Sequence, residues 1–481
     1  MTRAVRPYGS WPSPISPERL VTGAASPGEV AVDGDDVWWS EARPAEGGRT
    51  ALVRRRRDGT REEVLGDRPA PDDRTWNART ALLEYGGGAW CVESGVVTFA
   101  QWDDQRLHRL VADDPDAVPT PLTPEPASPR GLRYGDLVAL DRGWVLAVRE
   151  AHPGEAGAPA DAGEPVHQVV AVPTDGSAVD DPDRVRVLVS GPDFLASPRP
   201  GPARLAWVRW DHPRMPWDGT ELCVAGLGRD DRGAPVLRDE GAVVAGGPEE
   251  AVVQPEWGPD GTLWFCSDAR DGWWNLHRIA DAGGAGPDAA PEVVAPVDAE
   301  VGGARWVAGM RWFAPLADGR LLVTVTGHGA TGVGLVTPGP PGTGSESPLA
   351  RLALELAGAP VTLVSHLAAG PGPTQAWSWP APDGPRPRRC CSTCRRGPPP
   401  PPPTGAGAGG PCPPSAPSTW PPPAGPAPSA RRATSGSGPT TSPCPSPSPS
   451  RARAAAPPTA SSTGRPAPPR WRPTANGRPC W

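Results

Sequence analysis

Short runs of alternating apolar and polar residues, separated by glycine-containing turns, dominate the chain from about residue 25 to 365. The stretch at 30–42, VAVDGDDVWWSEA, has a turn at Asp33-Gly34 with β-rich residues on both sides. The same shape recurs at 91–100, 138–150, 217–225, 257–268 and 316–326. Two such runs joined by a short glycine turn are typical of a β-hairpin. The pattern predicts hairpins throughout and almost no helix, apart from a short one at 16–24.

A second β-rich segment follows several of these hairpins. These segments lie at 51–65, 107–114, 169–177 and 276–284. A hairpin plus such a segment has the size of a four-stranded propeller blade, which needs about 40–50 residues. Six units are evident, and a weaker seventh is expected across 332–340 and 361–369. We therefore predict an all-β fold, a β-propeller of about seven four-stranded blades, in preference to a sandwich or a β-helix. Most tryptophans should pack between blades.

Charge divides the chain into two parts. All 54 acidic residues lie in 1–383 with 34 arginines, while the rest has 13 arginines, no acid and, like the whole chain, no lysine. An acidic body argues against a nucleic-acid partner, because phosphate binding needs a basic surface. No apolar run is long enough for a membrane helix or a signal peptide. The body's three separated cysteines, Cys91, Cys223 and Cys266, fit reduced thiols. We expect a cytoplasmic protein with no membrane partner and no cofactor.

Several longer stretches together resemble one family. They are RPYGSWPSPIS (6–16), RTALLEYGGGAW (79–90), QWDDQRLHRL (101–110), RLAWVRWDHPRMPWDGTELCVA (204–225), WGPDGTLWFCSDARDGWWNLHRI (257–279) and GMRWFAPLADGRLLVT (309–324). They resemble the N-terminal propeller of bacterial prolyl oligopeptidase-family serine peptidases, closest to the dipeptidyl aminopeptidase or acylaminoacyl-peptidase-like branch. The resemblance covers about residues 6–365. It implies a propeller that restricts access of short peptides to an α/β-hydrolase domain following in cis, whose serine lies in G-x-S-x-G.

The segment after the resemblance has the wrong composition for that domain. There is no His after His366, no aliphatic residue larger than Ala after Leu367, no acid after Asp383 and no G-x-S-x-G in the chain. Such a segment cannot bury enough apolar area to offset its conformational entropy. We predict an N-terminal segment at 1–24, a propeller at 25–370 and a disordered low-complexity tail at 371–481, with no catalytic residues.

Three explanations of the tail are open. A natural Pro-rich tail would act as a linker or a recognition segment. A zinc knuckle at Cys391 and Cys394 has only one C-x-x-C and no second pair. We favour a reading-frame shift near 365–385 of a high-GC gene, because it explains the gain of Pro, Arg, Ala and Cys with the loss of acids and aliphatics.

The predicted function is a non-catalytic, substrate-gating propeller of a peptidase, inactive as translated. The alternative is a stand-alone binding or scaffold propeller.

The candidate substrate-binding residues are Glu84, Tyr85 and Arg106. Residues 84–88 resemble the family's H-E-Y-G-G motif, with Leu83 where His is common. A carboxylate there could bind a peptide's α-amino group through a charge-assisted hydrogen bond. The favoured alternative is structural: Glu84 caps a blade turn, and the glycines let backbones approach closely.

Three further side chains, Arg278, Asp211 and His212, could also have a functional role. Arg278, like Arg106, could contact substrate, but inter-blade hydrogen bonds are the favoured alternative for both. Asp211 and His212 look like part of a catalytic dyad, yet no nucleophile accompanies them and a proline follows. A structural turn is expected there.

Overall fold

The computed structural model describes residues 25–70, 74–141, 143–280, 290–342 and 348–352, the strands from there to residue 380, and a few residues before 25. The tail from 381 onward, with Cys391 and Cys394, lies outside the described residues, as does nearly all of the helix predicted at 16–24. The predictions of tail disorder and of a zinc knuckle therefore stay predictions.

Six sheets of four or five antiparallel strands follow one another along the chain. The first sheet is β1 (Ser26–Asp33), β2 (Asp36–Arg43), β3 (Arg49–Arg55) and β4 (Arg61–Glu63). The second is β5 (Trp90–Glu93), β6 (Val96–Ala100), β7 (Leu107–Val111) and β8 (Thr120–Pro121). The third is β9 (Leu132–Asp141), β10 (Trp144–Ala151), β11 (Val166–Pro173) and β12 (Arg186–Val189).

The later sheets repeat this order. The fourth is β13 (Phe194–Gly201), β14 (Arg204–Trp210), β15 (Glu221–Arg229), β16 (Pro235–Leu237) and β17 (Ala242–Gly246). The fifth is β18 (Val252–Trp257), β19 (Leu263–Ser267), β20 (Asn275–Ile279) and β21 (Glu292–Val293). The sixth is β22 (Phe313–Pro315), β23 (Leu321–Gly327), β24 (Ala330–Val336) and β25 (Leu349–Leu352). Two hairpins follow: β26 (Glu355–Leu356) with β27 (Ala359–Pro360), and β28 (Val364–Ala369) with β29 (Ala376–Pro380).

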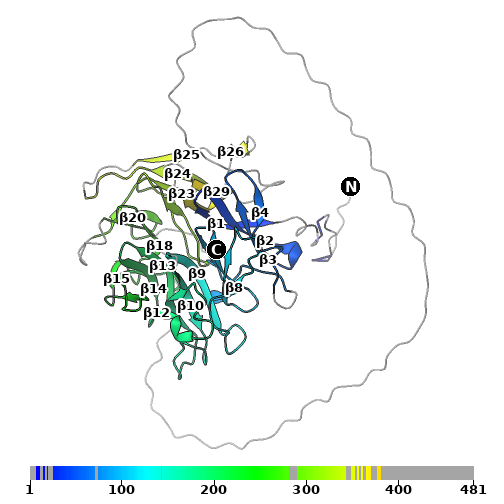
Figure 1. Ribbon diagram of the computed structural model, residues 1–481. Coiled ribbons are helices and arrows are strands. Elements are labelled where there is room, and N and C mark those ends of the chain that lie inside the picture. Colours follow the sequence, from blue (N-terminus) through cyan, green and yellow to red (C-terminus); the bar gives the residue numbers. More distant parts are fainter. Residues whose placement is uncertain are drawn as a thin grey trace, which may run out of the picture. The chain divides into compact units, whose positions relative to one another are not determined.

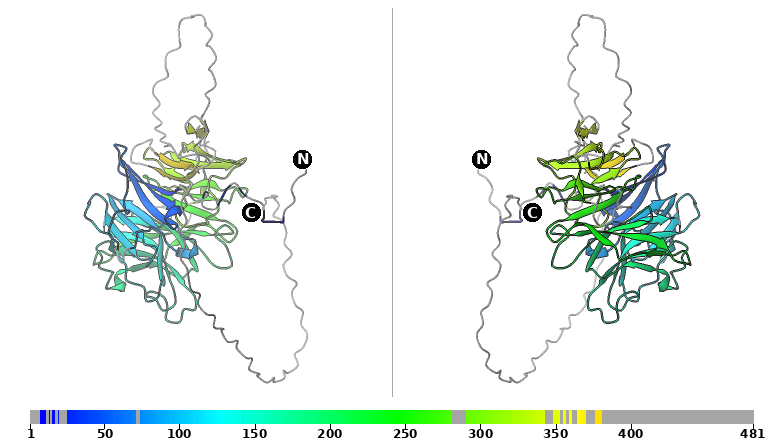
Figure 2. Two further views of the ribbon diagram at one scale, coloured as in Figure 1. Left: turned by 90° about the vertical axis from the view of Figure 1, so that its right-hand side faces the viewer. Right: turned by 90° about the vertical axis from the view of Figure 1, so that its left-hand side faces the viewer.

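The sheets form the blades of a propeller, with the first strand of each sheet innermost. Inner strands contact their neighbours in the order β1, β5, β9, β13, β18, β22, β28 and back to β1. Figure 1 shows the sheets succeeding one another in chain order from blue to yellow, and the side views in Figure 2 show the last strands beside the first sheet. The predicted all-β propeller is confirmed, with six full blades and a two-stranded hairpin at the seventh position.

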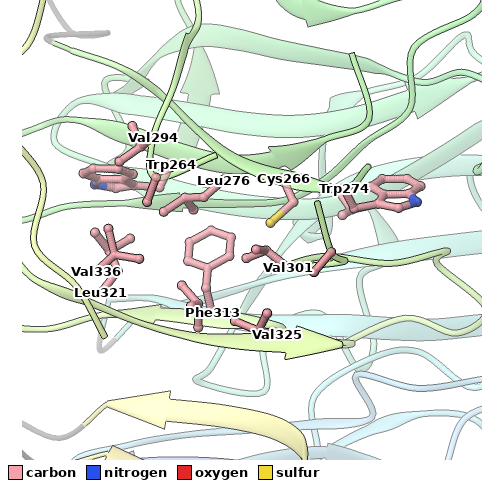
Figure 3. Close-up of a cluster of buried hydrophobic side chains, with 14 of the residues drawn as sticks. Trp264, Cys266, Trp274, Leu276, Val294, Val301, Phe313, Leu321, Val325 and Val336 are labelled. Carbon is pink, nitrogen blue, oxygen red and sulfur yellow. The ribbon is translucent and has the colours of Figure 1, made fainter. Parts of the chain in front are cut away.

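Apolar residues from adjacent sheets interlock to form the core. Between the fifth and sixth sheets, Phe313 points toward Cys266 and Leu276, with Trp264 and Val325 nearby (Figure 3). Equivalent clusters fill the other junctions, because each strand alternates residues toward the two sheets that flank it. Most buried tryptophans belong to these clusters, as predicted.

The seventh position closes the ring. Leu367 of β28 is fully buried against Leu322 of the sixth sheet, and Ala368 packs against Trp39 of the first. The reading-frame shift favoured from the sequence would fall in or just after the last blade, so it predicts an incompletely closed ring. That expectation is wrong for the inner strands, because β28 lies between β22 and β1.

Three predictions made from the sequence differ from the structure. Residues 332–340 belong to β24 and its exit, so they complete the sixth blade rather than begin a seventh. The glycine turn at 217–225 is part of a longer loop between β14 and β15, and the turn of that blade's first hairpin lies at Ala203. Strand β29 pairs with β28 beyond the boundary predicted at 370.

Among the described residues, no helix has the length and apolarity needed to cross a bilayer.

Candidate functional site

One end of the propeller carries a pocket of about 220 Å³. In an up-and-down sheet, the loop between the second and third strands emerges at the same end as the connection to the next sheet. Three segments of this kind meet at the pocket: the β14–β15 loop (211–220), the connection from β4 to β5 (64–89) and the connection from β21 to β22 (294–312). The pocket is therefore built from three loop segments, far apart in the sequence, that the rigid ring holds together.

Aromatic rings form the walls of this pocket. The ring of Phe194 stacks on that of Trp210, with centroids 5.2 Å apart, and the rings of Trp217 and Trp306 lie 4.5 Å apart. Tyr85 is 77% exposed and Trp306 is 59% exposed at the rim. Exposed aromatic side chains around a concave apolar surface are typical of a binding site for a small molecule or a peptide side chain.

The loop that carries Glu84 and Tyr85 is anchored by a buried carboxylate. Leu83 and Glu84 have left-handed backbones, with φ of 52° and 64°. The Leu83 N–H donates to Oε2 of Glu150 at 2.7 Å, and Arg133 lies 3.0 Å from the other oxygen. Burial raises the pKa of Glu150, but the nearby His167, the hydrogen bond from the Leu83 N–H and the charge of Arg133 together lower it to about 2. The anchor is thus ionised at neutral pH.

The predicted binding residues occupy different places. Tyr85 lines the pocket, and Glu84 is exposed at its side, where its Oε1 pairs with Arg133 Nη1 at 2.5 Å. Arg106 is not a pocket residue; its Nε donates to the Thr123 carbonyl within the second blade. The structure thus brings Tyr85, but not Arg106, to the pocket. Their role in binding stays a prediction.

The other three candidates, Arg278, Asp211 and His212, have structural partners. Arg278 donates to the Gly339 carbonyl of the next blade, the inter-blade bond that was favoured. Asp211 and His212 lie in the β14–β15 loop, where Asp211 accepts from the Asp193 N–H and the His212 N–H donates to the Asp193 carboxylate. These bonds make a turn, as expected, although His212 also lines the pocket.

The glycines at 86–88 allow a close backbone contact across the ring. The Ala308 N–H donates to the Gly86 carbonyl at 3.0 Å, and Gly87 and Ala308 form a parallel bridge. A Cβ on Gly87 would lie 2.2 Å from the Ala308 carbonyl oxygen, and one on Gly88 would lie 2.5 Å from the Cα of Asp136. Close approach is thus the reason for this glycine run. We call residues 305–309 the strap.

A layer of ion pairs joins the inner strands of several blades next to the strap. Asp136, fully buried on β9, accepts from Arg305 at 2.8 Å, and Arg199 on β13 lies 3.8 Å away. Arg199 also pairs with Glu256 on β18, which in turn pairs with Arg311. Burial raises the pKa of Asp136, but the two arginines lower it overall. Every charge in this layer has an opposite charge beside it.

Glu29 joins the layer from the first blade. Its Oε1 accepts the Gly88 N–H at 2.6 Å. Burial is the main reason that the pKa of this carboxyl is raised to about 7; the Gly88 hydrogen bond lowers it, Asp136 raises it and Arg311 lowers it. Glu29 therefore titrates near neutral pH.

The pocket aromatics and the ion-pair layer were not foreseen from the sequence. Trp210 and Trp217 do lie in WDHPRMPWDG, one of the more specific stretches, but their spacing shows no pocket. Nothing in the sequence signals that Arg305 and Asp136 meet, since they are far apart along the chain. No cluster of three or more His, Cys, Asp or Glu side chains suited to a metal occurs within the part of the chain that the structure describes.

Solved structures with the same architecture identify the relatives. Puromycin hydrolase is 39% identical, with a TM-score of 0.64, and the match covers 78% of this chain and 53% of that one. A puromycin-hydrolyzing peptidase of Mycobacterium tuberculosis is also 39% identical, with a TM-score of 0.62, over 78% of this chain and 52% of that one. No family model and no curated protein matches the chain.

The chain matches the N-terminal β-propeller of the prolyl oligopeptidase family. It spans about half the length of the relatives it matches, and the match does not extend to their catalytic domain. The resemblance noted in the sequence is confirmed at the level of this family's propeller.

Proposed function

We propose that this chain is the substrate-gating propeller of a serine peptidase acting on short peptides or on peptide-like amides such as puromycin. The observation that carries the proposal is a 39% identity with puromycin hydrolase that covers 78% of this chain but only 53% of that enzyme. The aromatic pocket supports it, because the pocket can hold an apolar side chain of such a ligand. In the proposed enzyme, a hydrolase domain provides the chemistry and the propeller limits which peptides reach it, in the cytoplasm.

The chain by itself has no hydrolytic activity under this proposal. It has no G-x-S-x-G, and no His follows His366 to serve as the base of a triad in a later domain. The described cysteines are also poor nucleophiles, because burial raises the pKa of Cys91 to about 12 and that of Cys223 to about 11.

Purified full-length chain tests both parts of the proposal. We expect no turnover of puromycin, aminoacyl-nitroanilides or acyl-peptides and no labelling by a fluorophosphonate. Titrating puromycin should still change tryptophan fluorescence through the pocket, and Trp306→Ala should remove the change. The control is Trp102→Ala, since Trp102 lies outside the pocket between Arg79 and Arg130. Fluorophosphonate-sensitive turnover, or binding that Trp306→Ala leaves intact, would contradict the proposal.

A further inference from the structure

The aromatic pocket is lined by basic side chains, although the body of the chain is acidic. Among the described residues that line it, none is Asp or Glu, whereas Arg214, Arg305 and His212 are present. The chain up to residue 383 carries 54 acidic residues against 34 arginines. Arginines without an acid, in a pocket of an otherwise acidic protein, favour a ligand that carries a negative charge.

The charge of Arg305 is already balanced. Its guanidinium donates to Asp136 at 2.8 Å and lies 5.8 Å from the centre of the Trp210 ring. Only 7% of this residue is exposed. Arg305 therefore fixes the strap beside a pocket ring, and Arg214 is the arginine that can receive a ligand.

Arg214, in the β14–β15 loop, lacks a close acceptor. Its guanidinium donates no hydrogen bond to any described residue, and the Asp211 carboxylate lies 3.8 Å from its Nη2, beyond hydrogen-bonding distance. The Nη1 atom is buried, whereas 23% of the whole side chain is exposed. A buried N–H without an acceptor is costly, because it has lost water and gained no other partner. An acceptor on a ligand would remove this cost.

The carboxylates near the pocket are engaged elsewhere. Asp211 and Asp218 each accept a backbone N–H in or beside the β14–β15 loop. Glu84 pairs with Arg133, with Oε1 and Nη1 2.5 Å apart. These bonds occupy the groups that would otherwise attract an ammonium ion, so the pocket does not favour the amino end of a peptide.

We propose that the pocket binds the C-terminal residue of a short peptide, with an aromatic or large apolar side chain among the rings and the α-carboxylate on Arg214. A planar guanidinium fits a carboxylate through two parallel hydrogen bonds. The pocket, about 220 Å³, is small for a ligand site, which favours a single residue over a longer segment. The choice of a peptide rests on the proposed function, whereas the preference for a carboxylate rests on the pocket itself.

Three peptides test the proposal on the full-length chain: Ala-Ala-Phe, its C-terminal amide and its N-acetyl form. Tryptophan fluorescence measures their affinities. We expect amidation to weaken binding ~10-fold or more, because it removes the charged partner of Arg214. Acetylation should leave the affinity unchanged, because the amino end lies outside the pocket. Equal affinities of the acid and the amide, as expected if Arg214 instead meets an acceptor on another domain, would overturn the proposal.

Substitution of Arg214 assigns the preference to one side chain. In Arg214→Gln, the acid and the amide should bind equally, and Arg214→Lys should show an intermediate ratio, because an ammonium group keeps the charge without the paired geometry. The control is Arg57→Gln, which removes the same charge from an 82% exposed side chain paired with Asp35. A ratio that persists in a folded Arg214→Gln variant would overturn the assignment.

Puromycin separates this proposal from the proposed function, because it has no carboxylate. Puromycin binding that depends on Trp306, together with equal affinities of acid and amide, would overturn the carboxylate site alone. A preference for the acid that depends on Arg214, without any puromycin binding, would support the carboxylate site and contradict the proposed function.

Discussion

At the scale of single residues, Glu29 shows how burial at the centre of the ring raises the pKa of a carboxyl group. Its carboxyl is held beside Asp136 and against the Gly88 N–H, and its pKa is raised to about 7 from an ordinary value of 4.5. Between pH 4.5 and about 7, Glu29 is therefore protonated in the folded chain and ionised in the unfolded chain. Stability from this group is fully present below pH 4.5 and is lost as the pH rises through 7.

Glu29→Gln should remove this pH dependence, because the amide keeps a neutral acceptor for the Gly88 N–H. In the wild type, we expect the free energy of unfolding to fall by about 1–3 kcal/mol between pH 5 and 8 from this group. Glu46→Gln is the control: that carboxyl is exposed, and its arginine partners lower its pKa, so its titration lies below this range. Denaturant unfolding at several pH values measures the slopes. A wild-type slope that survives in Glu29→Gln would contradict the assignment.

At the scale of the element, β28 decides whether the ring is closed. Leu367 is fully buried against the sixth blade, while its neighbour Ala368 faces the first. Leu367→Ala should cost about 2–5 kcal/mol, because it leaves a cavity between two blades. The control is Val187→Ala on β12, which is 45% exposed and should cost well under ~1 kcal/mol. Urea unfolding measures both; equal losses would show that β28 does not brace the ring.

The strands also show which parts of the fold could be predicted from the sequence. Alternation and glycine turns located the first hairpins of most blades, such as β1–β2 around Gly34, because strand period and turn chemistry are local. They failed at β13–β14, where the turn at Ala203 has a left-handed φ of 55° without a glycine. The pocket could not be predicted, since contacts such as Trp217 with Trp306 depend on how blades pack around the ring.

At the scale of the whole molecule, the described part of the chain is a propeller with a pocket at one end, where the strap contacts the far side of the ring. The relatives carry a catalytic domain in addition to this propeller, and this chain spans about half of their length. We therefore propose, as the central claim, that the propeller is part of a two-domain peptidase and that the reading frame shifts near 365–385, before the hydrolase domain.

The nucleotide sequence of the gene beyond codon 365 tests this claim most directly. We expect one of the other two frames to encode an α/β-hydrolase pattern with G-x-S-x-G, followed by an Asp and then a His in the order of that fold. If both other frames lack the motif, a downstream His and any α/β pattern, the frameshift account is contradicted and the propeller is a stand-alone binding protein.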